Sequence, residues 1–256
     1  MAKQIRYQLV LVASPQTDPE FDFTDSREMP RRYVIACAPR SGSNLLCELL
    51  MQTGKMGCPI EYLHPQSIMV PMARRICGEG EVTGDQYVTE LLRRRTSPNG
   101  VFGLKTFCWQ AKPYIDGRRF RVLFENAAYV YLTRKEKRRQ IVSLAIAWQT
   151  EQWTSYDKQH GQARYDEDLV HQAGRFLAQE ATGWERFFDN HEIEPLRITY
   201  EGFLADLDKV GRSVCALVDV TPSHPFRIEQ AATKKQSNSV NDDWLEKAER
   251  VLSAYV

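Results

Sequence analysis

The sequence has few of the features that mark a metal-binding or disulfide-rich protein. No C-x-x-C pair and no metal-ligand spacing occurs among its six cysteines, which are Cys37, Cys47, Cys58, Cys77, Cys108 and Cys215. Several of them lie inside apolar runs, where a cysteine is usually a small buried hydrophobe. We therefore expect reduced thiols, with neither a disulfide framework nor a metal site.

A long hydrophobic segment is also missing. The apolar run near the N-terminus covers residues 9–13. That run is too short for the apolar region of a signal peptide and far too short to span a bilayer. The sequence thus predicts a soluble cytoplasmic protein without a membrane span.

The chain has no excess of charge of either sign. It carries 34 lysines and arginines against 33 aspartates and glutamates, a formal net charge of +1. This balance argues against general binding to nucleic acid or to a membrane surface. Basic clusters do occur at residues 93–95, 117–121 and 134–139. Acidic residues elsewhere balance these clusters, so any requirement for positive charge is local.

The pattern of apolar segments predicts an α/β fold, in which apolar strands alternate with helices. Strands are expected at residues 5–13, 33–38, 101–107, 128–133 and 196–203. Helices are expected at residues 45–54, 84–95, 118–127, 135–153, 166–190, 206–218 and 241–256. Such alternation is typical of a mainly parallel sheet covered by helices on both faces. Since no repeat and no linker divides the chain, we expect one domain over residues 1–256, in which residues 1–32 form an N-terminal extension.

The segment "PRSGSN" connects the first core strand to a helix and has the composition of an anion-binding loop. A tight strand-to-helix turn exposes several backbone N–H groups together with the positive end of the helix dipole. Gly42 permits close backbone approach, and Ser41, Ser43 and Asn44 add polar side chains. Arg40 can clamp a phosphate or sulfate through two parallel hydrogen bonds. The competing interpretation is a turn that uses glycine and serine for geometry alone.

This loop lacks the lysine of a nucleoside-triphosphate loop. Such loops follow the pattern GxxxxGK[ST], in which the lysine contacts the outer phosphates and the hydroxyl contacts magnesium. In the window "ACAPRSGS", Ala36 stands where the first glycine belongs, and no lysine follows Gly42. The sequence therefore argues against hydrolysis of ATP or GTP.

An ordered series of motifs gives a more specific signal. It runs "APRSGSNLLCELL", "TGKMGCPIEYL", "GLKTFCW", and then a strand that ends at Arg134 before the helix "KEKRRQIVSLAIAWQTEQW". From about Tyr33 to the C-terminal helix, the chain resembles bacterial sulfotransferases that use 3′-phosphoadenosine-5′-phosphosulfate (PAPS), in particular the trehalose 2-sulfotransferase-like family. The resemblance implies the sulfotransferase fold, a P-loop-like three-layer sandwich with a central, mainly parallel sheet flanked by helices.

The resemblance also implies a donor site. In the family the first loop binds the 5′-phosphosulfate end of PAPS, which here assigns Arg40, Ser41, Gly42, Ser43, Asn44 and Leu45. The family usually has threonine or serine at the position of Asn44. By the same resemblance, Arg134 and Ser143 bind the 3′-phosphate. The resemblance further implies a late basic loop, here with Lys234 and Lys235, that closes over the donor.

Sulfuryl transfer requires a base for the acceptor hydroxyl and fixed positive charge for the leaving phosphate, and it requires no metal in principle. The family's glutamate falls on Glu61, which suits the role of general base if partial burial raises its pKa toward the operating pH. His64 is the alternative base. Lys105, late in its strand, is a candidate for contact with the leaving group or the acceptor. The alternative for Lys105 is a side chain that reaches solvent.

Three tryptophans are candidates for stacking on the adenine or on a sugar acceptor: Trp109 after the second core strand, and Trp148 and Trp153 on the long helix. Packing in the core is the competing interpretation, and it fits Trp148 better because this residue extends the apolar stripe of the helix.

Our hypothesis from the sequence is a cytoplasmic enzyme that moves a sulfuryl group from PAPS to a hydroxyl of a carbohydrate or glycan-like acceptor and releases the desulfated nucleotide PAP. The rival hypotheses are a P-loop kinase of a small metabolite and a non-catalytic protein of the same fold that binds the nucleotide or a partner. Trehalose, another glycan, a lipid-linked sugar and a secondary metabolite all stay open as acceptors. The resemblance further implies a homodimer.

Overall fold

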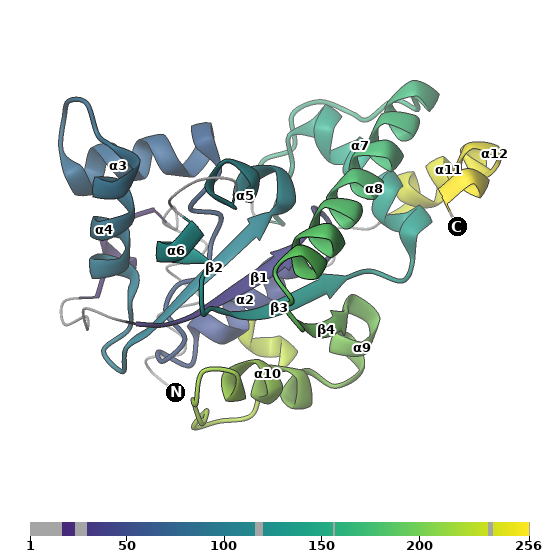
Figure 1. The fold of residues 1–256 in the computed structure, drawn as a ribbon. Coiled ribbons are helices and arrows are strands. Elements are labelled where there is room, and N and C mark those ends of the chain that lie inside the picture. Colours follow the sequence, from purple (N-terminus) through teal and green to yellow (C-terminus); the bar gives the residue numbers. More distant parts are fainter. Residues whose placement is uncertain (1–16, 24–29, 116–119, 156, 235–237, 256) are drawn as a thin grey trace.

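The fold is built on one four-stranded sheet, and the computed structural model describes residues 17–23, 30–115, 120–155, 157–234 and 238–255. The strands are β1 (Arg31–Cys37), β2 (Val101–Phe107), β3 (Ala128–Thr133) and β4 (Leu196–Thr199). They lie in the order β2-β1-β3-β4, and each pairs with its neighbour in parallel (Figure 1). The expected α/β fold with a central parallel sheet is confirmed.

The helices fill the connections between these strands. In chain order they are α2 (Ser43–Met51), α3 (Val70–Cys77), α4 (Gly84–Arg95), α5 (Cys108–Ile115), α6 (Phe120–Leu123), α7 (Lys137–Thr150), α8 (Glu167–Asn190), α9 (Tyr200–Ala205), α10 (Leu207–Ala216), α11 (Ser239–Lys247) and α12 (Glu249–Leu252). One-turn helices lie at Pro19–Phe21, Pro65–Met69, Ile228–Gln230 and Ser253–Tyr255.

Strand β1 is buried on both faces, as its continuous apolar run predicts. Successive side chains of a strand point to opposite faces. Tyr33, Ile35 and Cys37 belong to a cluster with the apolar residues of α2 and α10. Val34 and Ala36 belong to the opposite cluster, which includes aromatic residues of α8. The sheet is therefore the middle of three layers (Figure 1).

Trp184 of α8 fixes this helix over the carboxyl end of β1. Its side chain is fully buried, and its indole Nε1 donates to the carbonyl oxygen of Cys37 at 3.0 Å. The ring also stacks on Phe188, with centroids 5.8 Å apart. Because Cys37 immediately precedes the strand-to-helix loop, this contact sets the position from which that loop leaves the sheet.

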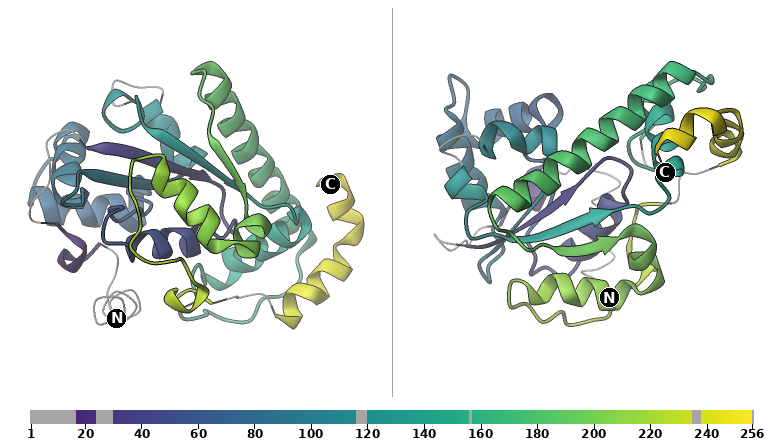
Figure 2. Two further views of the ribbon diagram at one scale, coloured as in Figure 1. Left: turned by 90° about the horizontal axis from the view of Figure 1, so that it is seen from below. Right: turned by 45° about the vertical axis from the view of Figure 1, so that its right-hand side comes forward.

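A third apolar cluster joins the long helices to the C-terminal ones. Ile141 of α7, Val170 of α8 and Trp244 of α11 are all buried in it. Figure 2 shows α11 and α12 beside α7 and α8, at one end of the molecule. This cluster braces α7, the helix that carries Ser143.

Some expected boundaries are wrong. The strand expected at 196–203 ends at Thr199, where the chain turns into α9, because the Thr199 hydroxyl accepts the N–H of Gly202 at 3.2 Å and caps the new helix. The single terminal helix is divided at Ala248 into α11 and α12. Of the helix expected at 118–127, the described part is α6, Phe120–Leu123.

Helix α3, whose segment contains one proline, was not expected from the sequence. Pro71 lies in the first turn, where a helix tolerates proline because the missing N–H has no intrahelical partner there. The strand expected at residues 5–13 lies outside the described residues, as does most of the proposed extension at residues 1–32.

The contact of Trp184 predicts a measurable contribution to stability. The substitution Trp184→Phe removes the indole donor, leaves the Cys37 carbonyl oxygen buried and reduces packing beneath α8. We expect the free energy of unfolding to fall by about 2 kcal/mol, measured by urea denaturation. The control is Trp153→Phe, because Trp153 is 44% exposed, and we expect a change within about 0.5 kcal/mol. Equal effects of the two substitutions would contradict the prediction.

Candidate active site

A pocket of about 1450 Å³ opens at the carboxyl ends of the strands. This is where parallel α/β sheets bind their ligands. Its lining includes most of the residues that the sequence singled out: Arg40, Gly42, Ser43, Asn44, Leu45, Glu61, His64, Lys105, Arg134, Ser143 and Lys234. Pockets for one small ligand usually measure about 300–1,000 Å³. This pocket is therefore large enough for two reactants.

The loop after β1 has the geometry of an anion site. Gly42 has a left-handed conformation, with φ at 82°, and a Cβ atom there would lie 2.2 Å from the Tyr200 ring. Only glycine fits that position without a shift of the ring. Helix α2 begins at Ser43 with no side-chain cap at Gly42. Its first N–H groups and its positive dipole end are thus directed at the pocket.

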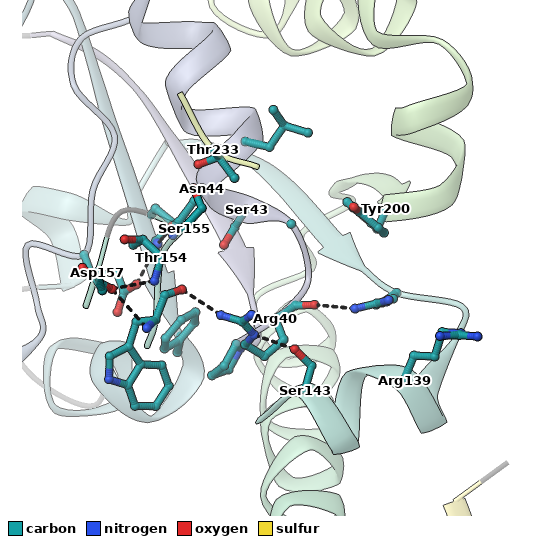
Figure 3. A pocket seen from close by; sticks show the side chains of 18 of the residues that line it. Arg40, Ser43, Asn44, Arg139, Ser143, Thr154, Ser155, Asp157, Tyr200 and Thr233 are labelled. Atoms are coloured by element: carbon teal, nitrogen blue, oxygen red, sulfur yellow. Dashed lines mark hydrogen bonds and ion pairs between the residues drawn. The ribbon is translucent and has the colours of Figure 1, made fainter. Parts of the chain in front are cut away.

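Arg40 points from this loop toward α7. Its Nε donates to Ser143 Oγ at 2.9 Å, and its Nη1 donates to the carbonyl oxygen of Trp153 at 2.7 Å (Figure 3). Arg134 in turn donates to the carbonyl oxygen of Arg40 at 3.3 Å. Three residues that the resemblance assigns to the donor are therefore in direct contact. Burial and the nearby charge of Arg134 lower the pKa of Arg40 to about 10, so its guanidinium stays charged at neutral pH.

Further groups arrange positive charge at the start of α7. The Arg134 guanidinium lies 5.2 Å from the centroid of the Tyr200 ring. Glu201 accepts the N–H groups of Lys135 and Glu136 at 2.9 and 3.1 Å, which holds the chain just before α7. Arg139, which also lines the pocket, forms an ion pair with Asp242 of α11 at 3.0 Å. A phosphate or sulfate group bound at this end would replace carboxylates as the partner of these arginines, because Arg134 now pairs with Glu136 and Glu201 at 3.6 and 3.9 Å.

Glu61 lies at the edge of β2, on the segment after α2. The N–H of Lys105 donates to the carbonyl oxygen of Ile60 at 3.1 Å and fixes this segment to the strand. The Lys105 ammonium then lies 2.6 Å from Glu61 Oε1 and 2.6 Å from Asn44 Oδ1. Gln110 of α5 donates to the other oxygen, Oε2, at 2.7 Å. One chain of contacts therefore joins the anion loop to the candidate base.

The ion pair reverses the pKa shift that the sequence suggested for Glu61. Burial alone would raise the pKa of this carboxyl, but the charge and hydrogen bond of Lys105, with the hydrogen bond from Gln110, outweigh burial and hold the pKa below its usual value. Burial disfavours the charged form of Lys105 as well, yet Glu61 raises the pKa of this ammonium. The Lys105 side chain is 6% exposed, so it does not extend into solvent.

His64 lies beside the candidate base but makes a local structural contact. Its Nδ1 accepts the N–H of Ser67 at 3.3 Å and so caps the one-turn helix that follows. Its ring meets Trp109 edge-on, with centroids 5.5 Å apart. Because Nδ1 accepts, a neutral ring carries its proton on Nε2.

Comparison with known proteins decides the family. The model of the Stf0 sulphotransferases matches residues 32–250, which is most of the chain. The chain belongs to the Stf0 sulphotransferase family. Because this family comprises sulfotransferases, the large pocket is the candidate active site of a sulfotransferase.

This Stf0 sulphotransferase has named relatives at modest identity. It is 26% identical over 254 residues to the trehalose 2-sulfotransferase of Mycobacterium tuberculosis (strain ATCC 35801 / TMC 107 / Erdman), covering 85% of this chain and 94% of the relative. It is 23% identical over 261 residues to the trehalose 2-sulfotransferase of Mycolicibacterium smegmatis (strain ATCC 700084 / mc(2)155), covering 86% and 95%.

Two solved structures are also similar to this chain. One is the sulfotransferase domain from the curacin biosynthetic pathway, with a TM-score of 0.46 and 16% identity, covering 89% of this chain and 98% of the domain. The other is the sulfotransferase domain from the Synechococcus PCC 7002 olefin synthase, with a TM-score of 0.45 and 12% identity, over the same shares of the two chains.

All three tryptophans singled out by the sequence line the pocket of this sulphotransferase. Trp109 and Trp153 are 39% and 44% exposed. Trp148 packs edge-on against Phe176 and against the third apolar cluster, as its place in the apolar stripe suggested. Trp153 does not lie on the long helix, because α7 ends at Thr150 and Glu151 takes a left-handed conformation.

The late basic segment reaches the pocket at Lys234, whose backbone N–H donates to Ser155 Oγ at 2.9 Å. The buried carboxylate of Glu48 accepts the N–H groups of Ala232 and Thr233 just before it, at 2.9 and 2.8 Å. Lys235 lies outside the described residues. Ser41 is fully buried and does not line the pocket, and its hydroxyl has no hydrogen-bond partner among the residues that the structure describes.

Several site residues were not found from the sequence. Tyr200 and Arg139 line the pocket, and Gln110 contacts the candidate base. Tyr200 was missed because the strand was expected to continue to residue 203, which placed Tyr200 inside the strand and not at its carboxyl end. Gln110 gave no signal in the sequence, because its contact with Glu61 spans 49 positions of the chain.

The described ranges contain no group of three or more His, Cys, Asp or Glu side chains that could hold a metal ion. None of the helices in these ranges is both long and apolar enough to cross a membrane. All six cysteines are free thiols.

Glu180 of α8 holds the start of α5, where Trp109 and Gln110 lie. Its carboxylate accepts the N–H groups of Cys108 and Trp109 at 2.7 and 2.9 Å while its side chain is buried. Burial raises the pKa of this carboxyl to about 7, although the two backbone hydrogen bonds favour the charged form. The wall of the pocket therefore depends on a carboxylate that titrates near neutral pH.

This raised pKa predicts a pH-dependent stability. The carboxyl of Glu180 titrates near 4.5 in the unfolded chain and near 7 in the folded protein. Between these pH values the unfolded chain gives up this proton while the folded protein keeps it. As the pH rises, the free energy of unfolding of the wild type therefore falls by up to about 3 kcal/mol relative to that of Glu180→Gln. Urea denaturation of both proteins from pH 4.5 to 8 measures the difference. Parallel curves for the two proteins would contradict the prediction.

Proposed function

We propose that this sulfotransferase moves a sulfuryl group from PAPS to a hydroxyl of a carbohydrate, with Glu61 as the general base. The observation that carries the proposal is the chain of contacts from Asn44 through Lys105 to Glu61, because it connects an anion loop to a carboxylate inside one pocket. The two trehalose 2-sulfotransferases among its relatives support a sugar as acceptor.

The residues at one end of the pocket fit the donor. Arg40, Arg134 and Arg139 gather positive charge there, and the N-terminus of α2 adds backbone donors. In our proposal these N–H groups, with Ser43, hold the 5′-phosphosulfate. Arg134 and Ser143 hold the 3′-phosphate, and Arg40 lies between the two groups because it already contacts Ser143. PAPS supplies the activated sulfuryl group.

The proposed step is a direct displacement at sulfur. The acceptor oxygen forms a bond to sulfur while the bond between sulfur and the oxygen of the 5′-phosphate breaks. The proton of the acceptor hydroxyl passes to the Glu61 carboxylate, and the negative charge leaves on the nucleotide bisphosphate PAP. Fixed cations and backbone donors stabilise that charge, so the proposal assigns no role to a metal.

The ion pair gives Lys105 a role in this step. Before transfer its ammonium is shared between Glu61 and Asn44. Proton transfer cancels the charge of Glu61, so Lys105 loses its partner as negative charge grows on the leaving phosphate. The lysine can then stabilise that charge without a large movement. This coupling offsets the low pKa of Glu61, which by itself makes the carboxylate a weak base.

The acceptor would bind at the other end of the pocket, near Glu61, His64 and Trp109. The half-exposed Trp109 offers an apolar face of the kind on which sugar rings stack. Trehalose is the first acceptor to test, and another glycan, a lipid-linked sugar or a secondary metabolite is an alternative. The homodimer and the cytoplasmic location stay predictions.

The two rival functions predict different ligands. A small-metabolite kinase would bind ATP with magnesium, which the loop disfavours because no lysine follows Gly42. A non-catalytic nucleotide-binding protein would bind PAPS but transfer nothing to a hydroxyl. Binding and transfer measurements therefore separate the three functions.

Transfer of labelled sulfate from PAPS to a panel of acceptors tests the reaction and its base. We expect sulfated product with trehalose or another glycan. We expect Glu61→Gln to lower kcat by about 10²-fold or more, because general-base catalysis is lost, while binding of adenosine 3′,5′-bisphosphate is kept. His64→Ala is the matched test of the alternative base. Normal turnover of Glu61→Gln together with an inactive His64→Ala would assign the base to His64.

Calorimetric titration with adenosine 3′,5′-bisphosphate tests the donor site. We expect Arg40→Ala and Ser143→Ala each to weaken binding about 10- to 100-fold, since each removes a hydrogen bond to a charged group. In the double variant we expect the affinity for the bisphosphate to fall by less than the product of the two single fold-changes, because the two side chains contact each other at 2.9 Å.

The matched control is Arg93→Ala on α4, an exposed arginine that pairs with Glu90 outside the pocket. We expect this variant to bind adenosine 3′,5′-bisphosphate with the affinity of the wild type. ATP with magnesium that binds more tightly than the bisphosphate would support the kinase instead.

A further inference from the structure

Gln110 is a buried polar residue next to the pocket that the reaction, as proposed, does not use. It lies in the first turn of α5, five positions after Lys105, and is 1% exposed. It does not line the pocket, whereas Glu61 and Lys105 do. Any effect of Gln110 on a bound acceptor must therefore act through a neighbour.

The hydrogen bonds of Gln110 fix the direction of its amide. Its Oε1 accepts the backbone N–H of Phe107 at 3.1 Å and faces the Thr106 hydroxyl at 3.3 Å. Its Nε2 donates to Glu61 Oε2 at 2.7 Å. A flipped amide would place N–H against N–H at Phe107 and oxygen against the carboxylate, so this orientation is the one compatible with both neighbours.

The backbone beneath Gln110 is also held in place. Glu180 accepts the N–H groups of the two preceding residues, Cys108 and Trp109. The amide of Gln110 is therefore a rigid donor, because its own helix turn is anchored to α8 and its carbonyl group is anchored to the end of β2.

From this geometry we propose that Gln110 is a positioning residue that holds the Glu61 carboxylate in the orientation in which it receives the acceptor proton. This inference rests on the proposed role of Glu61 as base. Lys105 binds one carboxylate oxygen, which by itself leaves the plane of the group free to turn. Gln110 binds the other oxygen, so the plane is fixed from both sides. Each oxygen keeps a second lone pair for the acceptor hydroxyl.

A glutamine buried only to satisfy hydrogen bonds would affect folding and leave kcat of the folded enzyme at its pH plateau unchanged. A positioning residue makes two further predictions. It affects kcat and leaves donor binding alone, and its replacement changes the titration of Glu61. The second effect has a definite sign, because the hydrogen bond from Gln110 helps to hold the pKa of Glu61 low.

The test measures kcat and KM as functions of pH for wild type, Gln110→Leu, Gln110→Glu and Glu61→Gln, with PAPS as donor and trehalose as acceptor. Gln110→Leu keeps the size of the side chain and removes the donor. We expect its kcat to fall about tenfold or more, with an unchanged KM for PAPS, and the acidic limb of its pH profile to move to higher pH.

Gln110→Glu gives the sharper signature. At low pH the new carboxyl is protonated and can still donate to Glu61, so activity is partly rescued there. As the pH rises both carboxyls become charged and repel each other. We expect kcat of this variant to fall with rising pH, whereas the wild type rises to a plateau. Gln140→Leu is the matched control, since Gln140 is also buried and donates to Pro39 in the anion loop at 2.8 Å; we expect it to raise the KM for PAPS without this change of profile.

A measurement that needs no acceptor follows the Glu61 carboxyl directly. Its ¹³C resonance, assigned by its absence in Glu61→Gln, reports the pKa of this group in enzyme bound to adenosine 3′,5′-bisphosphate. We expect a higher pKa in Gln110→Leu than in wild type. The same bound nucleotide shows that the variant is folded with an intact donor site.

The outcomes separate this inference from the function on which it rests. Normal turnover of Glu61→Gln would overturn the base assignment itself. An inactive Glu61→Gln, together with wild-type kcat and pH profiles in both Gln110 variants and an unchanged Glu61 pKa, would overturn the positioning role alone.

Discussion

The ion pair between Lys105 and Glu61 is the interaction on which the arrangement of the site depends. Both side chains are largely withdrawn from water, 6% and 20% exposed, and an unpaired charge in such a place costs several kcal/mol. Each residue therefore requires the other to keep its position. The lysine also fixes the neighbouring segment through its backbone N–H and reaches the anion loop through Asn44. One strand position thus ties together the sheet, the loop and the candidate base.

The parts of the fold that could be predicted from the sequence are those set by local pattern. The run from Tyr33 to Ala38 is apolar without alternation, and the structure buries β1 on both faces accordingly. The end of β4 could not be predicted in this way, since an apolar alternation continues past Thr199 while the threonine side chain caps a new helix. Helix α3 could not be predicted either. Pro71 is compatible with a helix only in the first turn, and that position is known only once the helix start is known.

The same distinction between local pattern and contacts of distant residues applies to the site. A series of motifs singles out the loop, Arg134 and Ser143, and the structure brings them together at Arg40, while their binding of a donor stays a prediction. The pKa direction of Glu61 could not be predicted. Burial and the Lys105 charge act in opposite directions, and their balance depends on a distance of 2.6 Å between residues 44 positions apart. Gln110 depends on a similarly distant contact.

The position of Lys105 between Glu61 and Asn44 gives a physical reason for the absence of a lysine from the loop. A lysine inside the loop, as in triphosphate loops, is a charge permanently committed to phosphate. Here an ammonium from β2 contacts the loop, and its charge is neutralised by Glu61 as long as that carboxylate is ionised. In the proposed reaction the charge becomes available to the leaving group as Glu61 takes the proton. Asn44, where the family usually has a hydroxyl residue, presents its amide oxygen to that ammonium at 2.6 Å and so places it between the base and the loop. The loop therefore needs no lysine of its own. The charge of Lys105, which is available only when Glu61 is protonated, suits a reaction in which proton transfer and departure of the phosphate occur together.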